Sequence, residues 1–161
     1  MQPVVHRPDQ GELHRIGGSS VTIKAGGDHT DGTFFLSETV IEAGFPGLPP
    51  HVHRRLHDMF FVLEGTLTMR LGDEIEEAEP GTFVCVPPGV THTFSNRTDS
   101  PVRFLNFNTP SGWENYMRDL GRELAAGRTP TSAEIGRIAA RYDFGAVAQV
   151  PTGGTGEAPP T

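Results

Sequence analysis

Residues 44–65 have the sequence GFPGLPPHVHRRLHDMFFVLEG, in which two histidines, His51 and His53, are separated by a single residue. Because alternate side chains of a β-strand point to the same face, both imidazoles are expected to face the same way. Asp58 follows, and the apolar run at 59–63 is typical of a buried strand. Two imidazoles and a carboxylate ahead of a buried strand indicate a metal site inside a β-barrel.

Short β-strands are expected on both sides of this stretch, in segments rich in β-branched and aromatic residues. They are 19–25, 33–43, 58–63, 66–71, 82–86, 91–96 and 102–108, with a further short strand near Ile75. The segments 58–63 and 66–71 are expected to pair as a hairpin around Glu64-Gly65. Strands at such regular intervals, with 20 glycines and 14 prolines in the chain, predict an all-β barrel or sandwich.

After Pro110 the apolar period changes to that of helices. One predicted helix has an apolar face formed by Trp113, Tyr116, Met117, Leu120 and Leu124, and Gly127 is expected to end it. Thr131 and Glu134 form a capping box that begins a second helix. Its apolar side consists of Ile135, Ile138, Ala139 and Tyr142. We expect both helices to cover one side of the barrel, because the second has few basic residues for a helix-turn-helix DNA reader.

The length of 161 residues fits one domain with a full hydrophobic core. The expected plan is an N-terminal extension at 1–18, a barrel at 19–110, helices packed on the barrel at 111–145 and a flexible tail at 146–161. The extension is expected to lie along a barrel edge or to pair with a second subunit. The tail is rich in glycine, proline and threonine, which is typical of mobile segments.

The chain has a formal net charge of -7 and scattered basic residues, which argues against nucleic acid and an anionic membrane surface as partners. Its single cysteine, Cys85, has no partner for an internal disulfide and lies in an apolar strand, so we expect it in the core. The first residues show no secretory signal, and no apolar run is long enough to cross a bilayer. A cytoplasmic protein is therefore expected.

A second informative stretch, residues 81–96, has the sequence GTFVCVPPGVTHTFSN, and on these residues the chain resembles the cupins. The second cupin motif, G(X)5PXG(X)2H(X)3N, is matched at every fixed position by Gly81, Pro87, Gly89, His92 and Asn96. The first motif, G(X)5HXH(X)3,4E(X)6G, is matched by His51, His53 and Gly65. Asp58 stands where the family usually has glutamate, and Gly44 lies one residue too far upstream.

The resemblance implies a double-stranded β-helix, or jelly-roll barrel, in which one divalent metal ion is held by His51, His53, Asp58 and His92. Three imidazoles and a carboxylate suit Fe, Mn, Ni, Co, Cu or Zn, and ligand softness does not select among them. Octahedral preference would leave positions open for water, dioxygen or a chelating substrate. The resemblance also implies a homodimer, which an open barrel edge would favour.

Asp58 leaves three alternatives open, because aspartate is one methylene shorter than glutamate. The backbone moves inward, or Asp58 binds through water, or the metal keeps only the three histidines. His57 is a competing ligand at the shorter spacing that the motif allows. The apolar run and Gly65 fix the register on Asp58, so His57 is interpreted as a rim residue. Candidates to line an apolar cavity are Phe60, Val62, Leu67, Met69, Phe94 and Phe107.

These features favour a metal-dependent enzyme acting on a small enolisable or aromatic molecule. The resemblance is closest to small quercetin dioxygenase-like cupins, in which Asp58 would act as a catalytic base on a substrate hydroxyl. A redox-neutral cyclase, isomerase or epimerase, such as the cupins of aromatic polyketide pathways, is the main alternative. A non-catalytic small-molecule-binding module stays open, and a storage barrel is disfavoured because it needs no histidine cluster.

Overall fold

The protein is described from a computed structural model, which covers residues 2–125 and 131–147. The expected helix end at Gly127 and the tail from residue 148 onward lie outside the described residues, as does the side chain of Leu124.

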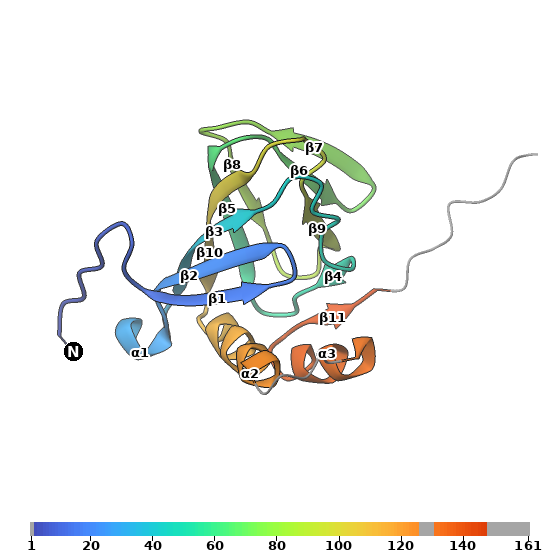
Figure 1. Cartoon of the computed structure of the whole chain (residues 1–161). Helices are drawn as coiled ribbons and strands as arrows, with labels where there is room; N and C mark the ends of the chain where they lie inside the picture. Colours follow the sequence, from blue (N-terminus) through green and yellow to red (C-terminus); the bar gives the residue numbers. More distant parts are fainter. Residues whose placement is uncertain (1, 126–130, 148–161) are drawn as a thin grey trace, which may run out of the picture.

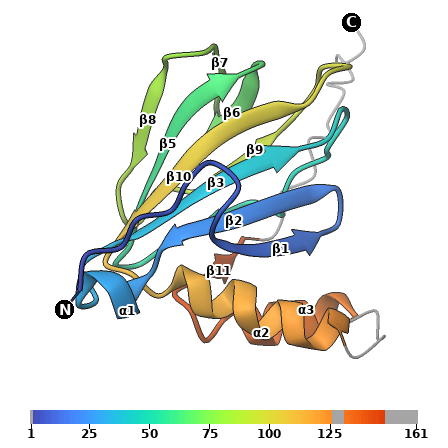
Figure 2. The same cartoon turned by 60° about the vertical axis from the view of Figure 1, so that its left-hand side comes forward.

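Two antiparallel sheets face each other and make up most of the fold (Figures 1 and 2). The six-stranded sheet runs β1 (Glu12–Ile16), β2 (Ser19–Ala25), β3 (Phe35–Ile41), β10 (Val102–Thr109), β5 (His57–Glu64) and β8 (Phe83–Val86). The five-stranded sheet runs β11 (Gly145–Ala146), β4 (His51–Val52), β9 (His92–Ser95), β6 (Leu67–Leu71) and β7 (Glu74–Ala78). The predicted all-β double-stranded β-helix is therefore confirmed.

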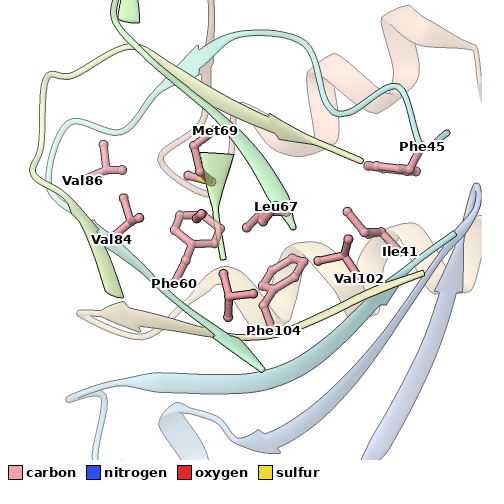
Figure 3. Packing of buried hydrophobic residues seen from close by; sticks show 11 residues of the cluster. Ile41, Phe45, Phe60, Leu67, Met69, Val84, Val86, Val102 and Phe104 are labelled. Atoms are coloured by element: carbon pink, nitrogen blue, oxygen red, sulfur yellow. The ribbon is translucent and has the colours of Figure 1, made fainter. Parts of the chain in front are cut away.

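The main hydrophobic core fills the space between the two sheets (Figure 3). Alternation along the strands produces it: the even-numbered residues of β10 point inward, as do Phe60 and Val62 of β5. Phe60 and Phe104 pack ring against ring at 5.8 Å between centroids. Of the residues expected to line a cavity, Phe60, Val62, Leu67 and Met69 belong instead to this packed core.

The predicted hairpin between the segments 58–63 and 66–71 is wrong. β5 pairs with β10 and β8, whereas β6 pairs with β7 and β9 in the other sheet. The chain changes sheets at Gly65, which has φ 74°, and a Cβ there would lie 2.8 Å from the carbonyl oxygen of Pro101. Glycine is needed here because the chain passes close to the start of β10, and a local turn signal cannot distinguish that from a hairpin.

Two side-chain orientations were also predicted wrongly. Cys85 is exposed, because side chains alternate along β8 and only Val84 and Val86 face the core. Phe107 lies on the outer face of β10, where its ring stacks on Phe34 at 5.1 Å. The inward-facing residues at this end of β10 are Asn106 and Asn108, which are polar and buried.

The helices pack against the six-stranded sheet through a second apolar cluster (Figure 2). As predicted, α2 (Trp113–Ala125) buries Trp113, Tyr116 and Leu120, and α3 (Ser132–Ala139) begins at a Thr131–Glu134 capping box. A short helix, α1 (Gly27–Thr30), connects the strands β2 and β3. In the N-terminal extension, β1 pairs with β2 along the sheet edge. None of the helices in the described ranges is long and apolar enough to cross a membrane.

Candidate metal centre

The strands bring four predicted site residues to one point inside the barrel. His51 in β4 pairs directly with His92 in β9, and His53 follows β4 on the same face. Asp58 enters from β5 of the opposite sheet. One ligand atom of each residue lies within 4.8 Å of the others, and all four residues are buried. His57, the competing ligand, is exposed.

The three imidazoles are oriented by backbone carbonyl groups. Nδ1 of His51 lies 2.9 Å from the carbonyl oxygen of Pro49, and Nδ1 of His92 lies 3.0 Å from that of Val90. Nδ1 of His53 lies 2.6 Å from the carbonyl oxygen of Asp143. Because a carbonyl oxygen only accepts, each Nδ1 donates a proton and each neutral ring has its Nε2 lone pair free. The histidines thus offer three Nε2 acceptors.

Asp58 is held by two asparagines that the sequence did not single out. Its Oδ1 accepts hydrogen bonds from Nδ2 of Asn106 and Nδ2 of Asn108, each at 2.6 Å. Its Oδ2 lies 3.2 Å from Nε2 of His92 and 3.8 Å from Nε2 of His53. One carboxylate oxygen is therefore occupied by amides, and the other faces the imidazoles. The shorter side chain of aspartate reaches the cluster directly.

This arrangement fits a divalent cation. Three Nε2 lone pairs and a carboxylate oxygen are all acceptors, and bringing them together in a buried place is unfavourable unless a cation or protons join them. Carbonyl groups bound to Nδ1 are the usual support for metal-binding histidines. The donor set suits the transition metals expected from the sequence and does not choose one. Ligation by these four residues stays a prediction.

The protonation of His51 supports its availability as a ligand. Burial, reinforced by the neighbouring His92, lowers the pKa of His51 from 6.5 to about 4. The neutral imidazole, which is the form that binds metals, therefore dominates near neutral pH.

We expect acidification to destabilise the metal-free protein. His51 takes up its proton near pKa 6.5 in the unfolded chain but only near 4 in the fold, so its contribution is lost as the pH falls through this window. Between about pH 7.5 and about pH 5, the free energy of unfolding should fall by about 2 kcal/mol from this group. Urea unfolding of chelator-treated protein measures it, with His51→Gln as the control that lacks this component. An equal fall in the free energy of unfolding of both proteins between these two pH values would contradict the prediction.

A cavity of about 260 Å³ adjoins the cluster, with His51 and Asp58 in its wall. Six aromatic side chains line it: Phe35, Phe45, Phe94, Phe104, Trp113 and Tyr116. Phe94 was a predicted lining residue, whereas α2, which supplies Trp113 and Tyr116, was expected only to cover the barrel. Ser37 and Thr39 add hydroxyls, which lie 3.3 Å apart. The lining is thus mainly apolar, with the acceptor cluster on one side.

Comparison with known proteins identifies the family of the barrel. Residues 37–108 match the Cupin_2 family, described as a cupin domain. Quercetin 2,3-dioxygenase of Bacillus subtilis (strain 168) is 32% identical over 101 residues, which are 60% of this chain and 29% of that enzyme. The match thus spans less than a third of the length of that relative.

Solved structures give the same fold. The polyketide cyclase RemF from Streptomyces resistomycificus matches with a TM-score of 0.59 and 24% identity, over 69% of this chain and 81% of that chain. A sugar phosphate isomerase of the cupin superfamily from Silicibacter pomeroyi matches with a TM-score of 0.52 and 27% identity, over 59% of this chain and 61% of that chain.

Proposed function

The chain belongs to the cupin superfamily, and from this premise we propose that it is a metal-dependent dioxygenase of quercetinase-like type. Its substrate would be a small enolisable aromatic molecule. One observation carries the proposal: three Nε2 lone pairs and one carboxylate oxygen converge beside an aromatic-lined cavity. The identity with quercetin 2,3-dioxygenase supports the same reaction class, although the match spans only 29% of that enzyme.

The lining of the cavity favours a substrate that is flat and uncharged. Its wall is mainly apolar and includes six aromatic side chains, which suit a flat, uncharged ring better than a charged group. The hydroxyls of Ser37 and Thr39 share one hydrogen bond, which leaves one hydroxyl hydrogen for a substrate oxygen. Such a wall favours a hydroxylated aromatic compound over a sugar phosphate.

Each group of residues at the site would have its own role. His51, His53, His92 and Asp58 would hold the ion, which when bound supplies Lewis acidity and, if redox-active, electron exchange with dioxygen. Because Oδ1 of Asp58 is already occupied by Asn106 and Asn108, Oδ2 would bind the ion and would give up that bond when it accepts the proton of the substrate hydroxyl. The aromatic walls would orient the substrate and exclude water.

A redox-neutral isomerase or cyclase is the second candidate. The contact between Asp58 Oδ2 and His92 Nε2, at 3.2 Å, places a carboxylate where it could relay a proton without dioxygen. The 27% identity with a sugar phosphate isomerase agrees with such chemistry, although the aromatic cavity suits a less polar substrate.

Oxygen uptake separates the two candidates. The metal-free protein would be loaded separately with Fe, Mn, Ni, Co, Cu or Zn and incubated with a flavonol, a 1,3-diketone and a hydroxylated polycyclic aromatic compound. The expected result is loss of substrate matched by equal uptake of dioxygen with at least one metal. Equal turnover without oxygen would favour the redox-neutral candidate. No turnover under either condition, with metal bound, would contradict an enzymatic function on these substrates.

A further inference from the structure

A segment far from the histidines in sequence completes their surroundings. We call Tyr142–Ala146 the C-terminal clasp; it follows α3 and ends in β11, which pairs with β4 beside His51 (Figure 1). In this pairing, Ala146 of β11 lies directly opposite His51 of β4. The clasp therefore adds an edge strand to the five-stranded sheet, beside the strand that carries His51.

Asp143 ties this clasp to the loop after His53. Its Oδ1 accepts a hydrogen bond from the backbone N–H of Arg54 at 2.9 Å. Its Oδ2 accepts from the N–H groups of Arg55 and Leu56, at 2.8 Å and 3.0 Å. Three N–H donors on one carboxylate form a strong local anchor. The backbone of Asp143 has φ 61°, a conformation that aspartate, asparagine and glycine tolerate best.

The same residue contacts a histidine of the cluster. The carbonyl oxygen of Asp143 accepts the hydrogen bond from Nδ1 of His53 at 2.6 Å, the shortest of the three carbonyl contacts to the cluster. For His51 and His92, the carbonyl acceptor lies only two residues away in the chain, whereas for His53 it lies 90 residues away. The orientation of His53 thus depends on tertiary contacts.

Phe144 shields the cluster from the same side. Its ring stacks on the imidazole of His51, with 4.4 Å between centroids and 18° between planes. It also stacks on Trp113 of α2 at 5.8 Å, and Trp113 contacts the ring of His53 at 5.7 Å. The clasp and α2 together cover two of the three imidazoles with aromatic rings.

We propose that Asp143 is a positioning residue of the metal centre. Its carboxylate anchors the clasp on the backbone of residues 54–56, which holds its own carbonyl group against His53 and Phe144 against His51. Metal affinity then depends on a segment outside both cupin motifs. This inference rests on the metal site of the proposed function.

The test compares Asp143→Gly with Asp143→Asn. Glycine keeps the backbone conformation and removes the carboxylate, whereas asparagine keeps the conformation and one acceptor oxygen. Competition with a chromophoric chelator would measure the affinity for Co(II) and Zn(II). We expect about a 10- to 100-fold weaker affinity for Asp143→Gly, with a shifted visible spectrum of bound Co(II), and a smaller loss for Asp143→Asn.

Thr131→Ala is the matched control, because it removes the cap of α3 without touching His53. It should lower the urea midpoint of unfolding and leave the metal affinity unchanged. Unchanged affinity in Asp143→Gly would overturn the proposal. So would an equal loss in Thr131→Ala, because the effect would then be general loosening of the helix.

A second measurement needs no metal. Long-range 1H–15N spectra of the metal-free protein should show a protected Nδ1–H of His53 in the wild type and lose this protection in Asp143→Gly. If the wild type binds no metal, the proposed function fails, and these spectra still decide whether Asp143 orients His53. Equal protection in both proteins would overturn the positioning role.

Discussion

Replacing His92 by alanine is expected to abolish retention of a divalent metal, with affinity reduced by more than about 100-fold. The side chain of His92 is 1% exposed, and its Nε2 is the ring nitrogen closest to Asp58 among the contacts described above. Alanine removes one of three convergent imidazoles and leaves a gap that no other side chain of the cluster spans. His53→Ala should have the same effect, because its Nε2 faces the same carboxylate oxygen.

His57→Ala is the control for this experiment, since His57 is an exposed histidine one residue from Asp58. It should leave the metal content unchanged. Metal analysis of protein purified without chelators, before and after dialysis, measures the difference. Wild-type metal content in both His53→Ala and His92→Ala would refute the site.

Asp58→Asn is expected to remove metal binding while leaving the fold intact. The amide groups of Asn106 and Asn108 both donate to Oδ1 of Asp58, so an asparagine at 58 would turn its oxygen toward them. Its NH2 group would then face Nε2 of His92, where it can donate a hydrogen bond but cannot bind a cation. The free energy of unfolding of the metal-free protein should change by less than about 1 kcal/mol.

Asp58→Ala separates the two consequences. It should also lose the metal. It leaves the buried amide of Asn108 without an acceptor, whereas Asn106 keeps its hydrogen bond to the carbonyl oxygen of Met59, and it should lower the free energy of unfolding by about 2 kcal/mol. Metal analysis and urea unfolding of both variants would be compared. Wild-type metal content in Asp58→Asn would show that the carboxylate is not a ligand, and equal stability of the two variants would contradict the role assigned to the asparagines.

The asparagine pair illustrates why part of the site escaped sequence analysis. Residues 102–108 were predicted as a strand, and strand periodicity alone places 104, 106 and 108 on one face. The prediction that Phe107 lines the cavity rested only on its aromatic character, and this alternation contradicts it. The sequence did contain a signal for this part of the site. Asn106 and Asn108 fall on one face of a predicted strand, and asparagine is uncommon both in strands and in buried positions.

The same limit applied to pairing between strands. Glu64-Gly65 carries a local turn signal that is shared by hairpins and by crossings between sheets. β5 pairs with β10, whose residues lie far away in the sequence: Asp58 pairs with Asn108, 50 positions later. Whether such a turn closes a hairpin or leads into the other sheet is decided only by how the two sheets pack. The orientation of Cys85 was predicted wrongly because its apolar strand was expected to be buried on both faces, whereas only one face of β8 is covered.

The sequence by itself determined the barrel, most of its strands, the two helices after Pro110 and the four groups that meet inside the barrel. It could do so because strand alternation and ligand spacing act over a few residues, and two such local patterns carry His51, His53, Asp58 and His92. Only the tertiary structure decided how those groups are held: the amides of Asn106 and Asn108 on Asp58, and the carbonyl group of Asp143 on His53. These contacts join residues 48 to 90 positions apart, and their geometry depends on how sheets and helices pack together rather than on any local preference of the chain.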